Sequence, residues 1–163
     1  MIGFGDTETV NLLLIMNGIG IPSRVIHGYV ADRYLGPINT LTPTVSIVAL
    51  LLYCWVAVHD RAGLYAFALF YGWFAAGAQG LFAGSLASLT SDLSKTGVRM
   101  GMVFTAMSFA SLTGSPIAGA LIESQGGSYV GAQVWAGTVV LAGCASLAAA
   151  RICQTGRNLR KKI

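Results

Sequence analysis

The side chain with the most distinctive chemistry in this 163-residue sequence is an arginine inside a long apolar stretch. A charge at the centre of a membrane costs roughly 2.5 to 3.5 kcal/mol on insertion scales, so Arg24 is expected to face a cavity or a partner. Asn17, Gly20, Arg24 and His27 follow one another at steps of three or four residues, which places them on one face of a helix. The pattern predicts a helix that turns a guanidinium and an imidazole toward a solute or ion pathway.

Other polar or aromatic side chains inside apolar stretches are candidates to line the same pathway. They are Tyr71, Gln79, Thr105 and Ser108. Each also has a packing interpretation, because hydrogen bonds between membrane helices average under about 1 kcal/mol and form without any ligand. The same alternative holds for Asn17, and packing is the commoner role of a lone histidine such as His27. Arg24 could likewise pair with a carboxylate elsewhere in the protein.

Neither the cysteines nor the histidines form a recognisable metal or catalytic pattern. Cys54, Cys144 and Cys153 are scattered without a Cys-x-x-Cys pair, and His27 and His59 lack His-x-x-x-His spacing. The sequence also lacks the Gly-x-Ser-x-Gly motif of a serine nucleophile. We therefore predict no metal site, no cofactor and no enzymatic activity.

The composition is typical of a membrane protein. Hydrophobic residues make up 55% of the chain and charged residues 10%, whereas an ordinary soluble domain carries about 25% charged residues. The 21 glycines follow no triplet period, which argues against a collagen-like chain and suits closely packed membrane helices. The cations lie between apolar stretches and at the C-terminus, so the net charge of +4 does not predict nucleic-acid binding.

Five segments are long and apolar enough to span a bilayer, which takes about 20 apolar residues. They cover residues 10–31, 38–58, 63–86, 100–122 and 130–150. In the third segment, Ala76, Gly80 and Gly84 recur at four-residue steps and predict a face for close helix packing. In the fourth segment, Pro116 is expected to break or kink the helix. The expected fold class is an all-α membrane protein with five transmembrane helices.

The cations also predict how the chain crosses the membrane. If the helix ends alternate sides, one side receives eight lysines and arginines, the other receives Arg61, and Arg24 stays within the membrane. The positive-inside rule then places the C-terminus in the cytoplasm and the N-terminus outside. We expect a multi-pass protein of the plasma membrane, with a transmembrane domain over residues 1–152 and a basic cytoplasmic tail over 153–163.

The turn after the first apolar stretch resembles a motif of the major facilitator superfamily. The turn reads Gly28-Tyr29-Val30-Ala31-Asp32-Arg33-Tyr34-Leu35-Gly36. It is similar to the Gly-x-x-x-Asp-Arg-x-Gly loop that joins helices 2 and 3 in that family and recurs, weakened, between helices 8 and 9. This copy has one extra residue before Gly36 and lacks the basic pair that usually follows. The resemblance implies a conformational gate formed by Gly28, Asp32, Arg33 and Gly36, although Asp32 and Arg33 could be ordinary charges at a membrane surface.

Three later stretches resemble monocarboxylate-transporter-like members of the superfamily, particularly the fungal branch. Two match the start and the end of helix 11 and one the start of helix 12: Gly97-Val98-Arg99-Met100-Gly101-Met102, Gly114-Ser115-Pro116-Ile117-Ala118-Gly119-Ala120-Leu121 and Gly127-Ser128-Tyr129-Val130-Gly131-Ala132-Gln133. With the turn, they cover nearly the whole chain in the right order. The resemblance implies that the five segments are helices 8 to 12, an incomplete C-terminal half of a major facilitator fold, with helices 1 to 7 missing.

The resemblance also bears on the role of Arg24. In the animal monocarboxylate transporters, helix 8 carries an Asp and, four residues later, an Arg that engages the substrate carboxylate. Arg24 matches that arginine, but Gly20 stands at the position of the Asp. The carboxylate linked to proton coupling is therefore absent, which leaves proton coupling open and is compatible with an anion-binding role for Arg24.

The predicted function is secondary transport of a small organic solute, a monocarboxylate or another organic anion, by alternating access. Two alternatives stay open: efflux of a fungal secondary metabolite, and a truncated membrane protein that does not transport but associates with a full-length relative. The expected partners are the lipid bilayer, the solute, and helices 1 to 7 of the full-length transporter; nucleic acid is not among them.

Overall fold

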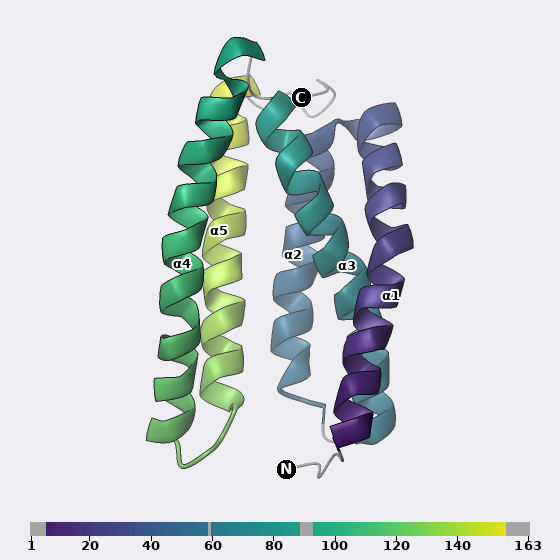
Figure 1. Ribbon diagram of the computed structural model, residues 1–163, viewed down its shortest axis with the longest axis vertical. Helices are drawn as coiled ribbons and strands as arrows, with labels where there is room; N and C mark the ends of the chain where they lie inside the picture. The colour runs from purple at the N-terminus through teal and green to yellow at the C-terminus, as the bar shows by residue number, and fades with distance from the viewer. Residues whose placement is uncertain (1–5, 59, 89–92, 156–163) are drawn as a thin grey trace.

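The computed structural model describes residues 6–58, 60–88 and 93–155, and five long helices account for most of them (Figure 1). These are α1 (Asp6–Val30), α2 (Pro37–Trp55), α3 (Arg61–Ser88), α4 (Thr96–Ser124) and α5 (Val130–Thr155). All five are long and apolar enough to cross a membrane, and the described residues contain no strand. The predicted all-α class with five candidate membrane helices is confirmed.

The helices do not begin and end where the expected membrane spans do. Helix α1 begins at Asp6, α2 ends at Trp55, and α5 continues to Thr155. Residues 153–155 of the expected tail are therefore still helical, whereas residues 156–163 lie outside the described part of the chain. A helix can continue into polar flanking residues, so its ends need not coincide with the edges of the apolar stretch.

The segment between α1 and α2 is a wider helical turn rather than an open loop. Residues Ala31–Leu35 form a π-helical turn, η1, which continues directly from α1. Gly36 closes it by donating its backbone N–H to the Ala31 carbonyl at 2.8 Å, and Gly36 itself has a φ of 88° that favours glycine. A π turn holds one residue more than an α turn, so it accommodates the extra residue before Gly36. Pro37 then begins α2 at a position where a missing N–H does no harm.

Of the two effects expected of Pro116, a break or a kink, the break is wrong, because the helix runs continuously from Thr96 to Ser124. Proline removes one backbone donor, and membrane helices tolerate this when neighbouring side chains supply further bonds. Helices α1 and α2 also continue through internal prolines.

The helices form one well-packed group and one loosely attached member. Helix α1 packs along α3, α3 along α2, and α2 along α5, whereas α4 makes slighter contacts with α5 and α3 and has no buried residue (Figure 1). The hydrophobic core is centred on Ala31, Leu41 and Leu81, and Leu147 of α5 packs against it. The core thus lies where η1, α2, α3 and α5 meet, and it fixes α3 between α1 and α2.

Candidate functional site

Small residues bring α1 and α3 close together. A Cβ atom added at Gly20 would lie 2.9 Å from the Cβ of Ala76, and one added at Gly72 would lie 3.0 Å from the Cα of Met16. Ser23 is 0% exposed in the same interface, and its hydroxyl donates to the Trp73 carbonyl. Side chains of ordinary size would separate the two helices, so this crossing depends on the small residues.

The predicted small-residue face of α3 is confirmed in two of its three positions. Ala76 lies against Gly20, and Gly80 lies against the stem of Arg24, whose Cγ would be 3.3 Å from an added Cβ. An added Cβ at Gly84 would meet nothing within 4 Å, so the inclusion of Gly84 is wrong.

Arg24 is held by α3 through a neutral partner. Its Nη2 donates to Oε1 of Gln79 at 3.2 Å. Within the described part of the chain, no carboxylate pairs with Arg24; Glu8, the nearest acidic residue of α1 with a described side chain, accepts from Arg61 at 2.9 Å. The positive charge of Arg24 is therefore hydrogen-bonded but not neutralised by these residues.

A cavity of about 390 Å³ lies along the α1–α3 pair, beside Arg24. Its polar lining consists of Asn17, Arg24, Tyr71 and Gln79. Its other lining residues are apolar or small: Leu13, Met16, Gly20, Ile21, Gly72, Ala75 and Ala76. We call this opening the Arg24 cavity. Four of the residues predicted to line a pathway thus come together, although Asn17 also donates its Nδ2 to the Leu13 carbonyl of its own helix.

His27 lies in the interface between α1 and α3 rather than in the lining of the Arg24 cavity. Its Nδ1 is 2.9 Å from the Ser23 carbonyl, which only accepts, so this contact requires the proton on Nδ1. The ring lies 6.1 Å from the Trp73 ring and 6.0 Å from the Phe74 ring. A Cβ added at Gly77 would be 2.6 Å from Nδ1, so the imidazole occupies the space that this glycine leaves.

Thr105 and Ser108 do not come near the Arg24 cavity. They lie on α4, where their hydroxyls donate to the carbonyls of Gly101 and Phe104 in their own helix. The packing interpretation of these two hydroxyls therefore has a direct structural counterpart, whereas a pathway role would need α4 to face the same space as α1.

The residues of the predicted gate are together at the other end of α1. Gly28 belongs to the last turn of α1, Asp32 and Arg33 are exposed on η1, and Gly36 is buried at the start of α2. The core residue Ala31 lies between Gly28 and Asp32. The turn that carries the two charges is thus anchored to the core on one side and exposed on the other.

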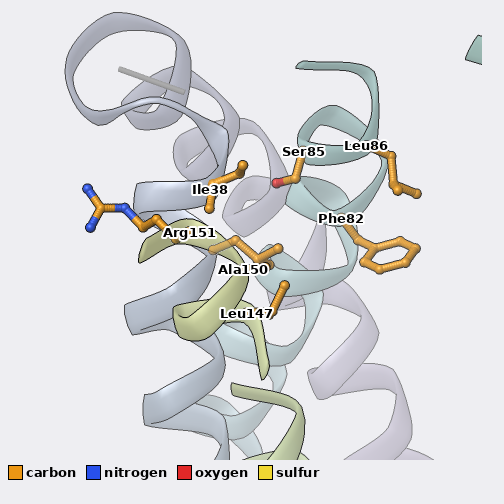
Figure 2. A pocket seen from close by; sticks show the side chains of 8 residues that line it. Ile38, Phe82, Ser85, Leu86, Leu147, Ala150 and Arg151 are labelled. Atoms are coloured by element: carbon orange, nitrogen blue, oxygen red, sulfur yellow. The ribbon is translucent and has the colours of Figure 1, made fainter. Parts of the chain in front are cut away.

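A second opening, between α2, α3 and α5, was not predicted from the sequence (Figure 2). It measures about 80 Å³ and is lined by Ile38, Leu41, Phe82, Ser85, Leu86, Leu147, Ala150 and Arg151. We call it the Ser85 cleft. The guanidinium of Arg151 points away from the other lining residues (Figure 2). Its Nε donates to Oδ1 of Asn39. Ser85 is 5% exposed, and its hydroxyl has no hydrogen-bond partner among the described residues.

The described residues hold no group of three or more His, Cys, Asp or Glu side chains that could bind a metal ion. In the Arg24 cavity, an arginine, two amides and a phenol line one opening. A guanidinium beside amide and phenol groups can bind an anion through charge-assisted hydrogen bonds.

Comparison with known proteins identifies fungal relatives. The chain is 41% identical over 146 residues to an MFS-type transporter of Gibberella zeae, a match that covers 90% of this chain and 33% of that protein. It is 35% identical over 163 residues to an MFS-type transporter of Gibberella moniliformis, covering 99% and 39%. It is also 31% identical over 132 residues to an aspyridones efflux protein of Emericella nidulans, covering 81% and 27%. No family model and no solved structure matches the chain.

The matched relatives are much longer than this chain. The chain spans about a third of the length of the first two relatives. The similarity therefore extends over nearly all of this chain and over only part of each relative.

Proposed function

We propose that this chain forms the anion-binding part of a secondary transporter for a small organic anion. The proposal is supported by its similarity to MFS-type transporters over nearly all of its own length. Its five long apolar helices make up part of a major facilitator fold. We assign them to helices 8 to 12. A multi-pass membrane protein follows from the helices and the relatives, whereas the solute is the subject of the proposal.

The observation that supports an anion is the environment of Arg24. The guanidinium is bound by the neutral Gln79 and has no carboxylate partner in the described part of the chain. An uncompensated charge within a membrane is expensive, which favours a role that repeatedly needs the charge. A guanidinium presents a planar fork of N–H donors that matches a carboxylate, so an organic anion is the solute that this site would select.

The remaining lining of the Arg24 cavity suggests the rest of the solute. The cavity of about 390 Å³ lies within the range of small-molecule sites, about 300 to 1,000 Å³. Leu13, Met16 and Ile21 form an apolar wall, while Asn17 and Tyr71 add hydrogen-bonding groups. A solute with one anionic group and an apolar body would use both kinds of surface.

Export of a secondary metabolite is the second candidate function, and the observation in its favour is a comparison. One relative, 31% identical, bears a name that describes it as an efflux protein for aspyridones. If this chain shares that direction of transport, the same cavity would receive an anionic metabolite from the cytoplasm. The monocarboxylate and metabolite alternatives differ in solute and direction, and both use Arg24.

We further propose that the protein resides in the plasma membrane with its C-terminus in the cytoplasm. The excess of cations on one side of the predicted topology supports this orientation. In the same orientation, η1 and its exposed Asp32 and Arg33 face the cytoplasm, where they would act as a conformational gate.

Transport is testable in a chimera in which this chain replaces the matching third of the Gibberella zeae relative. In proteoliposomes, the chimera should give saturable flux of at least one member of a panel of labelled carboxylates and sulfonates. The Arg24→Leu chimera, reconstituted in equal amount, should lose that flux because the anion loses its counter-charge. Equal flux by the two chimeras would contradict the proposed anion site and leave Arg24 a structural residue.

A further inference from the structure

We infer that Gln79 is a positioning residue for Arg24: it fixes the guanidinium through a neutral oxygen and thereby leaves the positive charge available to an anionic solute. The inference rests on the proposed function, since it assigns a role within the same cavity. It concerns a residue pair 55 positions apart that only the packing of α1 on α3 brings together.

Two consecutive residues of α3 hold the two ends of the Arg24 side chain. The stem lies on Gly80, where an added Cβ would be 3.3 Å from Cγ and 3.4 Å from Cβ of Arg24. The head donates from Nη2 to Oε1 of Gln79 at 3.2 Å. A long arginine side chain has many rotamers, and fixing it at both ends reduces the entropy that a solute must overcome on binding.

Because Gln79 is neutral, it leaves the charge and the other N–H donors of the Arg24 guanidinium available to a solute anion. An arginine has five N–H donors, and the contact with Gln79 uses one of them. A glutamate of the same shape would form a charge-assisted pair with Arg24 and cancel its charge, so a solute anion would have to displace it. A glutamine orients the guanidinium without competing for it.

A purely structural role for Gln79 makes a prediction about stability, not about anion affinity. If the Arg24–Gln79 contact served only to join α1 and α3, Gln79→Glu would keep or strengthen the joint, and Gln79→Met would weaken it. A positioning role ranks anion affinity differently. Wild type should bind most tightly, Gln79→Met less tightly because Arg24 is no longer fixed, and Gln79→Glu least tightly because the charge is cancelled.

The experiment uses the full 163-residue chain in lipid nanodiscs, with benzoate as the anionic probe and benzamide as its uncharged counterpart. Binding is measured by saturation-transfer NMR at neutral pH for wild type, Gln79→Met and Gln79→Glu. Gln133→Glu is the matched control, because it adds the same carboxylate to α5, away from Arg24. Thermal melting of each variant is recorded alongside, since it follows the joint between the helices rather than the charge.

We expect benzoate affinity to fall a few-fold in Gln79→Met and roughly 10- to 100-fold in Gln79→Glu, with Gln133→Glu unchanged. The melting temperatures of the two variants should rank the other way round from their benzoate affinities, with Gln79→Glu melting at or above the temperature of Gln79→Met. If wild type prefers benzoate to benzamide but Gln79→Glu binds benzoate as tightly as Gln79→Met, the positioning role is overturned and the proposed function stands. If wild type itself shows no preference for benzoate, the proposed function fails, and the inference fails with it.

Discussion

Helix α3 has an opening on each of two sides, and they differ in chemistry. The Arg24 cavity, shared with α1, measures about 390 Å³ and contains an arginine, two amides and a phenol. The Ser85 cleft, shared with α2 and α5, measures about 80 Å³ and has apolar walls apart from one buried hydroxyl and the stem of Arg151. In the Arg24 cavity, Arg24 is bonded to Gln79 and Asn17 to the backbone, whereas the Ser85 hydroxyl has no partner in the described part of the chain.

The comparison separates an organised polar site from an isolated polar atom. A buried hydroxyl without a partner costs about 1 to 3 kcal/mol, which a membrane bundle can tolerate. A guanidinium within a membrane costs more, and here α3 supplies both a glutamine and a glycine that fit around it. The presence of matching residues on a second helix is what favours the Arg24 cavity as the functional site.

The largest expected effect comes from overpacking the α1–α3 interface, which would push apart the two helices that line the Arg24 cavity. In Gly77→Leu, the new side chain would meet His27, whose Nδ1 lies 2.6 Å from the position of the added Cβ. Overpacking of this kind costs about 1 to 3 kcal/mol, and a ring held by neighbouring aromatics has little room to move. Thermal melting in nanodiscs should show clear destabilisation. Gly84→Leu is the control, because an added Cβ there meets nothing within 4 Å; equal melting of the two variants would contradict the packing described.

A smaller effect is expected from keeping the charge in the Arg24 cavity and changing its shape. Arg24→Lys retains a cation but replaces the planar fork of N–H donors with a point charge. The single ammonium group cannot both bond to Gln79 and pair with a carboxylate in the geometry that the guanidinium allows. Benzoate affinity should fall roughly tenfold. Titration of wild type and variant at one ionic strength would measure the difference, and unchanged affinity would mean that the cavity recognises charge alone.

The smallest effects concern two buried serines, Ser23 of α1 and Ser85 of α3, and only the first substitution should destabilise the chain. Ser23→Ala removes a fully buried hydroxyl that donates to the Trp73 carbonyl, so it should destabilise the chain by about 1 kcal/mol. Ser85→Ala removes a hydroxyl without a described partner and should be neutral or stabilise by up to about 1 kcal/mol. Equilibrium unfolding in mixed micelles would compare them. Destabilisation of similar size by both substitutions would show that the Ser85 hydroxyl has a partner after all.

The sequence was sufficient to predict the helices and part of the Arg24 cavity. Apolar stretches of about 20 residues predict membrane helices whatever their neighbours are, and a charge within such a stretch predicts a cavity or a partner. His27 illustrates the limit of spacing arguments. At about 100° per residue, it lies roughly 60° around α1 from Arg24, on the side of Gly20 and Ser23, which is the side that packs on α3.

Which helix lies beside which could not be read from the sequence. Thr105 and Ser108 have the same kind of polar side chain in an apolar stretch as the residues of α3, but α4 packs lightly against α3 and α5 and is not beside α1. The bond from Arg24 to Gln79 likewise depends on a contact between distant parts of the chain. The continuity of α4 through Pro116 could not be predicted either, because a proline in the sequence indicates a break or a kink, and a membrane helix can tolerate the lost donor.

The central claim is that the Arg24 cavity binds an organic anion through its guanidinium, and the most direct test compares two probes of the same shape on two proteins. Benzoate and benzamide are titrated against wild type and Arg24→Leu in nanodiscs, with circular dichroism to verify equal helix content. Wild type should prefer benzoate, and Arg24→Leu should lose this preference while its affinity for benzamide stays the same. An equal preference for benzoate in the two proteins would contradict the claim, because the charge that α1 carries into the cavity would then play no part in recognition.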